Sequence, residues 1–305
     1  MKLFQISTII SILFVSFPIF SYFKFGGFER EISRRLRLQK QKKPEQSFPK
    51  TAKVSINQQE QGHFIFVLGL EGTGHHMCAA IWNRCDRCAN SGDVGQLIYK
   101  QTPKQASGIF AETNPTTFAQ QNSQLVKKLA EKSKLEKGKL IILNTWKGSA
   151  SGEVSYPNFL GPYRFTQHPH AIHMFEEAKK AGTKVKFLVL VRSAQQMIVS
   201  TTIHRHFEKR QREVKILENM CQELRYTLME IGRENYGCID YNNLDPLMLS
   251  QTGKTLGFNG DSFKDTILSI FHASSRSSGN EFSKEDLDFM RPLISCAENL
   301  RKLCL

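Results

Sequence analysis

The chain has 305 residues and a formal net charge of +14, and 40% of its residues are hydrophobic. This length suits one medium-sized domain with appendages, or two small domains. Residues 24–53 hold ten Lys and Arg against three Glu, so this segment alone carries +7 of the excess. The rest of the chain is only modestly basic, which argues against a dedicated nucleic-acid binder and suits a small anionic ligand.

The first 60 residues do not resemble a globular domain. Residues 3–23 carry no charged side chain, and as a helix they would span roughly 31 Å, enough to cross a hydrocarbon core of about 30 Å. This run predicts an uncleaved signal-anchor transmembrane helix within residues 1–23, with a cleaved signal peptide as the alternative. Residues 24–60 are basic, rich in Gln and poor in large apolar groups, which is typical of a disordered stem.

Residues 61–305 read as one α/β domain. Apolar runs rich in β-branched residues predict buried strands at residues 63–68, 140–144, 184–192 and 236–241. Helices are predicted at residues 75–82, 121–137, 176–181, 194–209 and 212–232. Strands that alternate with helices indicate βαβ units, so we expect a parallel sheet flanked by helices on both faces.

A glycine-rich segment, GLEGTGHH at residues 69–76, follows the first predicted strand and opens a helix. Gly69, Gly72 and Gly74 permit a tight turn whose backbone N–H groups converge on an anion at the positive end of the helix. Thr73 can add a hydroxyl donor. No Lys-Ser/Thr pair follows, so this is not a Walker A loop. The segment predicts a phosphate-binding turn, with an ordinary strand-to-helix connection as the alternative.

A second segment, RSAQQMIVS at residues 192–200, follows the strand predicted at residues 184–192. Ligands of parallel sheets collect outside the carboxyl ends of the strands. Arg192 stands at that edge as a bidentate phosphate donor, and Ser200 lies about two helical turns further on. Taken alone, the pair fits equally well an arginine that caps the sheet and a small serine that packs on a helix.

Together and in this order, the two segments resemble the P-loop sulfotransferases. KFLVLVRSAQQMIVS is similar to the family's strand-Arg-x-Pro-x-Ser segment, with Ala194 in place of the proline. GLEGTGHHM is similar to the G-x-x-[KR]-[ST]-G-[TS]-x-L loop of the carbohydrate and tyrosyl-protein enzymes. Residues 238–258 resemble the family's later strand and helix, so the resemblance extends over most of residues 63–260. It implies a P-loop NTPase-like sulfotransferase fold.

The resemblance also implies a co-substrate, 3′-phosphoadenosine 5′-phosphosulfate (PAPS), and no metal. The turn residues that would bind its 5′-phosphosulfate are Gly69, Glu71, Gly72, Thr73, Gly74, His75 and His76. Arg192 and Ser200 would bind its 3′-phosphate, and Arg276 in the late polar loop is a further candidate, with a solvated loop residue as the alternative. The acceptor would be a hydroxyl of a glycan, a lipid or a protein tyrosine.

One departure from the family concerns catalysis. Gly72 stands where the family has a Lys or Arg that neutralises the leaving phosphate, so another cation must serve. The predicted replacements are His75, His76 and Lys147. In related enzymes the base is a carboxylate about twenty residues past the loop, a distance that leads here to Asp93. The alternatives for the base are Glu71, Glu112, Glu153 and a loop histidine.

The seven cysteines suit an oxidising compartment. Candidate disulfides are Cys221 with Cys238 and Cys296 with Cys304, although spacing does not define the connectivity. The odd number leaves at least one thiol outside any intrachain pair. Cys85 and Cys88 have the spacing of half a zinc site, but no second pair follows, so zinc is not expected.

The family resemblance predicts a single-pass type II protein of the Golgi membrane with its body in the lumen. Only Lys2 precedes the span, so the positive-inside rule favours the opposite orientation, and the conflict stays open. Two other functions also stay open. One is a P-loop kinase, which the missing Lys-Ser/Thr and Asn144 in place of a Walker-B Asp disfavour. The other is a catalytically degenerate member that binds an anion or a glycan, which Gly72 favours.

Overall fold

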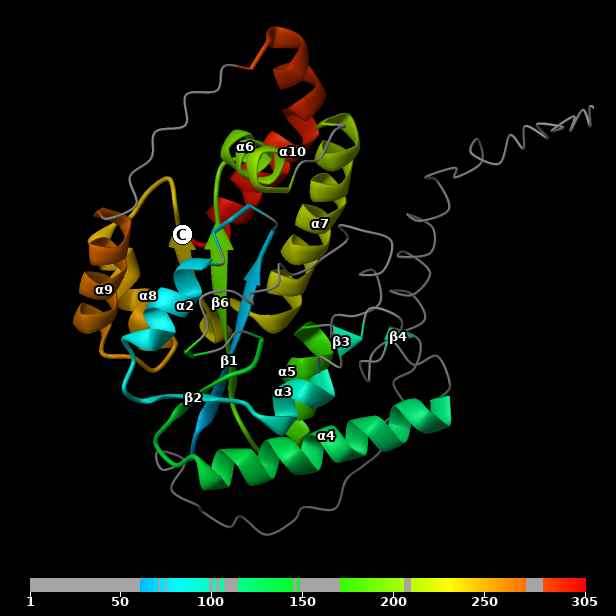
Figure 1. Cartoon of the computed structure of the whole chain (residues 1–305), viewed down its shortest axis with the longest axis vertical. Coiled ribbons are helices and arrows are strands. Elements are labelled where there is room, and N and C mark those ends of the chain that lie inside the picture. The colour runs from blue at the N-terminus through cyan, green and yellow to red at the C-terminus, as the bar shows by residue number, and fades with distance from the viewer. Residues whose placement is uncertain are drawn as a thin grey trace, which may run out of the picture. The chain divides into compact units, whose positions relative to one another are not determined.

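The computed structural model describes residues 61–70, 72–74, 76–98, 101–102, 105–106, 115–144, 147–148, 171–205, 210–272 and 282–305 (Figure 1). The predicted signal-anchor and stem lie outside these ranges. No helix within them is long and apolar enough to cross a membrane. All of the described residues belong to one unit, Ile56–Leu305.

Within the described ranges, five parallel strands form the central sheet in the order β2-β5-β1-β6-β7. Their bounds are His63–Gly69 for β1, Cys88–Asn90 for β2, Leu140–Ile142 for β5, Val185–Val191 for β6 and Tyr236–Asp240 for β7. Gly69 pairs with Leu190 and Val191 pairs with Asp240, so β1, β6 and β7 end at one edge. The shorter β2 and β5 end level with Ile65 of β1. A separate antiparallel pair consists of β3, Gln101–Thr102, and β4, Gln105–Ala106.

The four predicted strands are confirmed, and the parallel α/β class with them. The helices have the bounds α2 His76–Asn83, α3 Asp93–Ile98, α4 Pro115–Leu135, α5 Ala171–Lys180, α6 Ala194–Arg205, α7 Arg210–Ile231, α8 Pro246–Thr255, α9 Gly260–His272 and α10 Lys284–Lys302, with a short 3₁₀ helix at Arg233–Asn235. Gly182, which closely follows α5, has a positive φ of 66°, as is common for a residue that ends a helix in the left-handed region.

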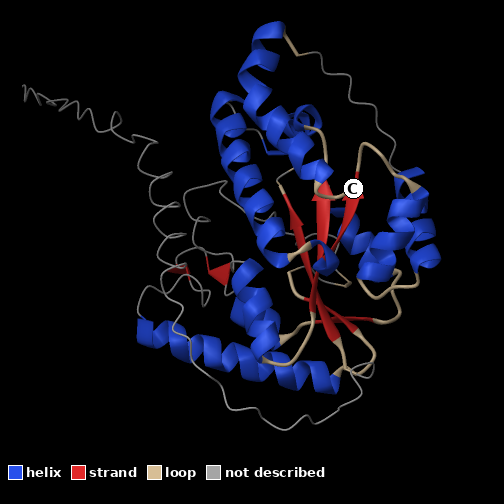
Figure 2. Cartoon of the chain, turned by 180° about the vertical axis from the view of Figure 1, so that it is seen from behind, coloured by secondary structure: helices blue, strands red, loops and turns tan. Residues whose placement is uncertain are grey.

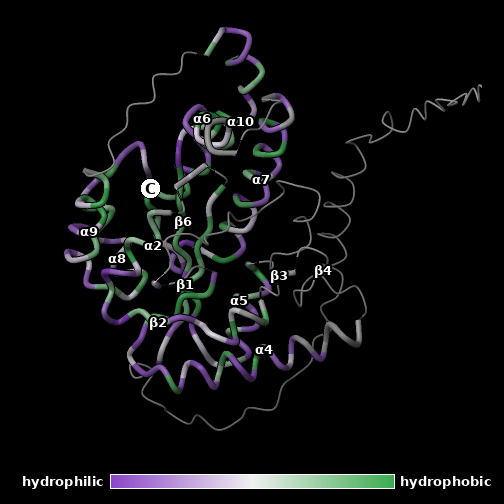
Figure 3. Tube along the Cα trace, viewed as in Figure 1, coloured by the Kyte–Doolittle hydropathy of each residue, from purple (hydrophilic) through white to green (hydrophobic). Residues whose placement is uncertain are grey.

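Alternate residues of β1 face opposite sides of the sheet, and each side has its own core. Phe64, Phe66 and Leu68 pack with α4, α5, α6, α7 and α10, whereas Ile65 and Val67 pack with α2, α8 and α9. Figure 2 shows helices on both sides of the strands. All five side chains are fully buried, which explains why this strand is a continuous apolar run. In Figure 3 the central strands have mostly hydrophobic colours, while α4 is largely hydrophilic.

All seven cysteines lie within the described ranges, and the predicted disulfide pairs are wrong. The disulfides join Cys221 to Cys296, Cys238 to Cys304 and Cys85 to Cys88. Eight residues of helix rise about 12 Å, so two cysteines separated along one helical segment, such as 296 and 304, are too far apart to bridge. Packing of α10 on α7 instead brings cysteines of the two helices together. The seventh cysteine, Cys78, is a buried thiol.

Candidate functional site

The glycine turn after β1 is closed by its own polar groups. The backbone N–H of Thr73 donates to the carbonyl of Leu70 at 3.1 Å, and its hydroxyl donates to the same oxygen at 2.7 Å. Thr73 is 1% exposed. The hydroxyl predicted to face a ligand therefore uses its proton to fix the turn. The backbone N–H of Met77 donates to the carbonyl of Gly74 at 3.0 Å and so joins the turn to α2.

Two positions in this turn accept only glycine. Gly72 and Gly74 have φ angles of 82° and 88°, in the left-handed region. A Cβ on Gly72 would lie 2.7 Å from the carbonyl oxygen of Met197 in α6, and a Cβ on Gly74 would collide with the Tyr241 hydroxyl. The missing loop cation thus has a structural reason, because α6 fills the space in which a Lys or Arg side chain at position 72 would begin.

Arg192 lies against the glycine turn, although 120 residues separate it from Gly72. Its Nη1 donates to the Gly72 carbonyl at 2.9 Å, and its Nε donates to Oε1 of Gln196 at 3.0 Å. Its guanidinium carbon lies 5.7 Å from the centroid of the Tyr241 ring. Within the described ranges no carboxylate pairs with it, so a half-buried cation with neutral partners stands at this edge of the sheet.

Burial lowers the pKa of Arg192 from its ordinary value, because desolvation penalises the charged form, and Tyr241 acts in the opposite direction. An arginine guanidinium nevertheless stays charged at neutral pH. A desolvated cation of this kind gains more from an anionic ligand than a solvated one does, since the ligand would supply the missing countercharge.

Ser200 lies on α6, the helix that packs on the glycine turn. The methyl of Thr201 is 3.2 Å from the Cβ position of Gly72, so Met197 and Thr201 form the face of α6 that covers the turn. Ser200 is half-buried and follows Gln196 by one helical turn. The structure therefore brings Arg192 to the turn and places Ser200 on the same helix as the residue that Arg192 contacts.

The end of β7 contributes two residues that the sequence analysis missed. The Tyr241 hydroxyl donates to the Gly74 carbonyl at 2.6 Å. Asn242 accepts from the Ser193 N–H at 2.6 Å and donates to Gln196 Oε1 at 3.1 Å. Their position was a usable signal, because Tyr241 ends a predicted parallel strand, Asn242 directly follows it, and the carboxyl end of that strand must reach this edge.

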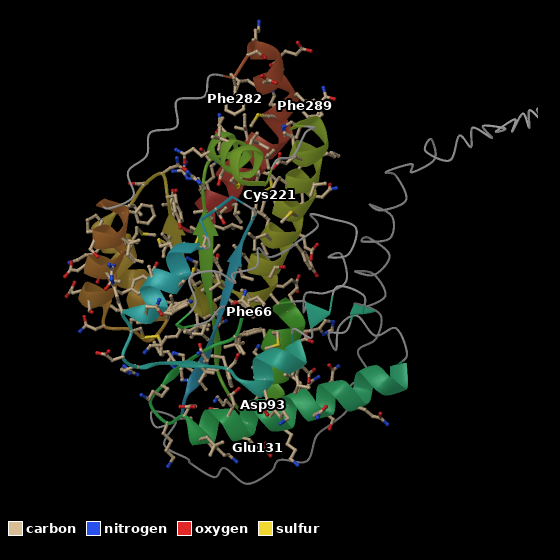
Figure 4. All side chains as sticks on the ribbon, in the orientation of Figure 1. Phe66, Asp93, Glu131, Cys221, Phe282 and Phe289 are labelled. Carbon is tan, nitrogen blue, oxygen red and sulfur yellow. A yellow bond between two sulfur atoms is a disulfide. The ribbon has the colours of Figure 1, made fainter. Side chains whose placement is uncertain are left out.

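Asp93, the predicted base, is not brought to the turn. It begins α3, after the edge strand β2, which ends level with Ile65 and so about 13 Å short of Gly69 along the sheet. Its carboxylate accepts from Lys128 Nζ at 2.5 Å, and this bond holds the pKa of Asp93 below its ordinary value. Figure 4 shows Asp93 beside α4. A carboxylate with a lowered pKa is a weaker base. Asp93 and Lys128 form a surface ion pair.

Lys147, a predicted catalytic cation, points to the opposite end of the sheet. Its Nζ donates to the carbonyls of Cys85 at 2.7 Å and Cys88 at 3.5 Å. Cys88 pairs with Leu140, and Leu140 pairs with His63, the first residue of β1. Six residues of strand, about 20 Å, separate that level from Gly69. The ammonium of Lys147 therefore stabilises the turn before β2.

Asn144 stands where a Walker-B aspartate would hold Mg²⁺, and its amide is occupied. Its Oδ1 accepts from the Val67 N–H at 2.7 Å, and its Nδ2 donates to the Val67 carbonyl at 2.6 Å. The residue is 0% exposed. Both ends of its amide join the segment after β5 to β1. No group of three or more His, Cys, Asp or Glu side chains within the described ranges could hold a metal ion.

The remaining candidates cannot be placed. Glu71, His75, Glu112, Glu153 and Arg276 lie outside the described residues. His76 is the first residue of α2, and its side chain is likewise not described. The site as described therefore consists of the glycine turn, Arg192 with Gln196, and the end of β7.

Fold and site define an α/β protein whose parallel sheet carries a glycine turn and a half-buried arginine at its carboxyl edge. No protein-family model matches the chain, and no curated protein matches it. Among solved structures, the chain is similar to the tunicamycin resistance protein of Deinococcus radiodurans, with 16% sequence identity. That match covers 69% of this chain and 95% of the other, with a TM-score of 0.37. We draw no function from a likeness at that distance.

Proposed function

We propose that the chain is a sulfotransferase that moves a sulfuryl group from PAPS to a hydroxyl of a glycan, a lipid or a protein tyrosine. The observation that carries the proposal is the hydrogen bond from Arg192 to the Gly72 carbonyl. One PAPS molecule carries its 5′-phosphosulfate and its 3′-phosphate on a single ribose, so the groups that bind them must be neighbours. The two segments that resemble the family's phosphate-binding segments are neighbours here.

In this proposal the backbone N–H groups of the turn and the positive end of α2 bind the phosphosulfate. The first turn of α2 carries no acidic residue that would repel it. Arg192 and Ser200, with Arg276 as a third candidate, bind the 3′-phosphate. The half-buried guanidinium supplies the countercharge that the nucleotide needs, and the nucleotide supplies the one that Arg192 lacks among the described residues.

The proposed chemistry is an in-line displacement at sulfur. The acceptor oxygen forms a bond to the sulfur while the bond from sulfur to the bridging phosphate oxygen breaks, and the acceptor proton passes to a base. PAP, the desulfated nucleotide, leaves, and the turn amides stabilise the charge on its phosphate. His75 and His76 keep the proposed role of the missing loop cation. Glu71, Glu112, Glu153 and a loop histidine remain the proposed alternatives for the base.

We place the folded body in the lumen of the Golgi, behind a type II anchor. Support comes from the Cys221–Cys296 and Cys238–Cys304 disulfides, which join residues 75 and 66 positions apart. Their cysteines are buried, which is typical of structural disulfides. Disulfides of this structural type persist in oxidising compartments. In this proposal the disulfides count for more than the charges that flank the anchor. The positive-inside rule is a statistical tendency, whereas structural disulfides persist in an oxidising compartment.

A degenerate binding member is the second candidate function, since Gly72 removes the loop cation. It shares nucleotide binding with the enzyme and differs in turnover. A P-loop kinase is disfavoured, because Asn144 carries no charge for Mg²⁺ and both ends of its amide are bonded to Val67. Transfer of label from PAPS to a hydroxyl acceptor separates the enzyme from the degenerate member, and a preference for PAP over ADP separates both from the kinase.

The direct test is isothermal titration of the full-length chain, purified in detergent, with PAP and with ADP. We expect PAP to bind and ADP to bind much more weakly. Arg192→Ala should weaken PAP binding about 30-fold, on the order of 2 kcal/mol for a charge-assisted contact. The matched control is Arg291→Ala, which removes an exposed arginine of α10 that pairs with Asp288. Absence of heat at millimolar PAP, or equal effects of the two substitutions, would refute the proposal.

A further inference from the structure

The Cys85–Cys88 disulfide differs from the other two in the length of chain that it closes. It joins residues 3 positions apart, against 75 and 66 for the Cys221–Cys296 and Cys238–Cys304 pairs. Stabilisation by a cross-link grows with the number of residues enclosed, so this short loop contributes least to holding the fold together. Stabilisation of the fold therefore does not account for this disulfide.

Its two sulfur-bearing residues also differ in exposure. Cys88 is 5% exposed, whereas Cys85 is half-buried and lines a surface cleft of about 220 Å³ that Cys88 does not line. The apolar residues that line the cleft include Leu140, Phe258 and Phe263. The half-cystines of the other two disulfides are at most 4% exposed. Of the two residues of the short disulfide, Cys85 therefore borders the cleft and Cys88 is buried.

Cations surround this disulfide. Arg84 and Arg87 line the same cleft, and Lys147 Nζ is bound to the carbonyls of Cys85 and Cys88. Among the described residues the two arginines bond to neutral partners, the Ser269 hydroxyl at 3.1 Å and the Gly138 carbonyl at 3.0 Å. Of the described residues that line the cleft, Asp86 alone is acidic. A cationic environment favours the thiolate form of cysteine, which is the form that exchanges with disulfides.

We propose that Cys85–Cys88 is a thiol–disulfide exchange site whose substrates are dithiols that enter this cleft. A thiolate of the dithiol attacks Sγ of Cys85, a mixed disulfide forms, and the bond to Cys88 breaks. Cys88 leaves as a thiolate and takes a proton from solvent. The second thiolate of the dithiol then attacks the mixed disulfide, leaves as part of a new disulfide, and releases Cys85, which is protonated in turn. The dithiol thereby supplies two electrons and two protons to the pair.

The exchange site is separate from the proposed nucleotide site. Cys88 is level with His63 at the amino end of the sheet, about 20 Å from Gly69 at the carboxyl end. A failure of PAP binding therefore leaves this proposal standing, and inert cysteines leave the proposed transfer reaction standing.

The first test is a redox titration of the full-length chain in mixtures of reduced and oxidised dithiothreitol. Thiols are quenched with a mass-tagged maleimide, and the labelled cysteines are identified by peptide mass spectrometry. We expect Cys85 and Cys88 to be labelled in mixtures that leave the other two disulfides closed, with the circular dichroism spectrum unchanged. Opening of all three disulfides in the same mixture, or of Cys85–Cys88 last, would overturn the proposal.

The second test compares Cys88→Ser with Cys85→Ser in oxidised glutathione. The remaining cysteine should form a mixed disulfide at least about tenfold faster at position 85 than at position 88, because only Cys85 lines the cleft. Peptide mapping distinguishes both from the buried thiol of Cys78. Equal rates, or a faster reaction at Cys88, would contradict the assignment of Cys85 as the attacked residue.

A third variant tests the cations. In the Cys88→Ser background, Arg87→Gln should slow the reaction of Cys85 several-fold, whereas Arg291→Gln, an equal change of charge on α10, should leave its rate unchanged. The same rate in both variants would show that net charge alone acts on the thiol and would remove the role of this cleft.

Discussion

The two ends of the same sheet use charged groups in opposite ways. At the carboxyl end, Arg192 contacts only neutral partners among the described residues, and the Gly72 turn beside it holds itself together with backbone groups. At the amino end, the ammonium of Lys147 is bound by two carbonyls, and His63 Nε2 lies 2.9 Å from the Leu256 carbonyl. The proposed function assigns Arg192 to an external anion, whereas Lys147 and His63 join segments of the protein to one another.

A position after a strand does not by itself make a residue part of a site. Lys147 comes a few positions after a predicted strand, and Arg192 stands at the end of another. Its backbone N–H is bonded to Oδ1 of Asn90 at 2.7 Å, and from there its side chain turns back toward the amino end. The direction of a long side chain depends on which acceptors are left unsatisfied nearby, and those belong to another part of the chain.

The largest effect on the free energy of unfolding is expected for the disulfides that stabilise the fold, in contrast to the one that we assign to exchange. The double variant Cys221→Ala with Cys296→Ala should lower the free energy of unfolding by about 4 kcal/mol, since that pair joins residues 75 positions apart. Cys85→Ala with Cys88→Ala should lower it by about 1.5 kcal/mol. Urea unfolding of the full-length chain measures both. Similar losses of stability in the two double variants would contradict this distinction between the two kinds of disulfide.

The next effect concerns the turn at the carboxyl end. Gly72→Ala should lower the free energy of unfolding by about 3 kcal/mol, because alanine meets both a positive φ and the Met197 carbonyl. Gly182→Ala is the matched control, with a φ of 66° but no atom within 4 Å of the added Cβ, and should cost about 1 kcal/mol. Denaturant unfolding decides the matter, and equal costs would mean that α6 does not hold the turn.

The elements that could be predicted from the sequence are those whose signal is local. β1, β6 and β7 are apolar runs because both faces of the sheet are covered, and the glycine turn and Arg192 follow two of them. The edge strand β2 is three residues, Cys88–Asn90, and carries no such signal. Its place depends on pairing with β5.

The parts that could not be predicted depend on contacts between distant segments. The Cys221–Cys296 disulfide follows from the packing of α10 on α7, which the spacing of the cysteines along the chain does not reveal. The pairing of Asp93 with Lys128 in α4 is of the same kind, since spacing from the glycine turn says nothing about a lysine 35 positions on. The reason why position 72 is glycine lies in α6, more than 120 residues away.

A smaller effect tests the closed amino end through its pH dependence. Burial lowers the pKa of His63, because desolvation penalises the charged ring, and the bond to the Leu256 carbonyl opposes this shift. The unfolded chain therefore binds a proton more readily, so His63 contributes stability that is present above its unfolded pKa of about 6.5 and is lost as pH falls below it. Between about pH 7 and pH 5, His63→Gln should lose less stability than the wild type in urea unfolding. Identical pH slopes would show that His63 is solvated.

The smallest effect is expected at Asp93, where a substitution distinguishes a surface ion pair from a catalytic base. Lys128 lowers the pKa of Asp93, so the pair stabilises the folded state above the unfolded pKa of about 4 and loses this contribution as pH falls through the lower folded value. The side chain of Asp93 is 61% exposed, which keeps the contribution small. Asp93→Asn should therefore leave unfolding at pH 7 almost unchanged and, under the proposed function, leave sulfuryl transfer within about twofold of the wild type. Lys128→Met removes the same ion pair without touching the carboxylate and should behave alike. A loss of transfer of about a hundredfold in Asp93→Asn alone would make Asp93 the base and would bring the edge at β2 into the site.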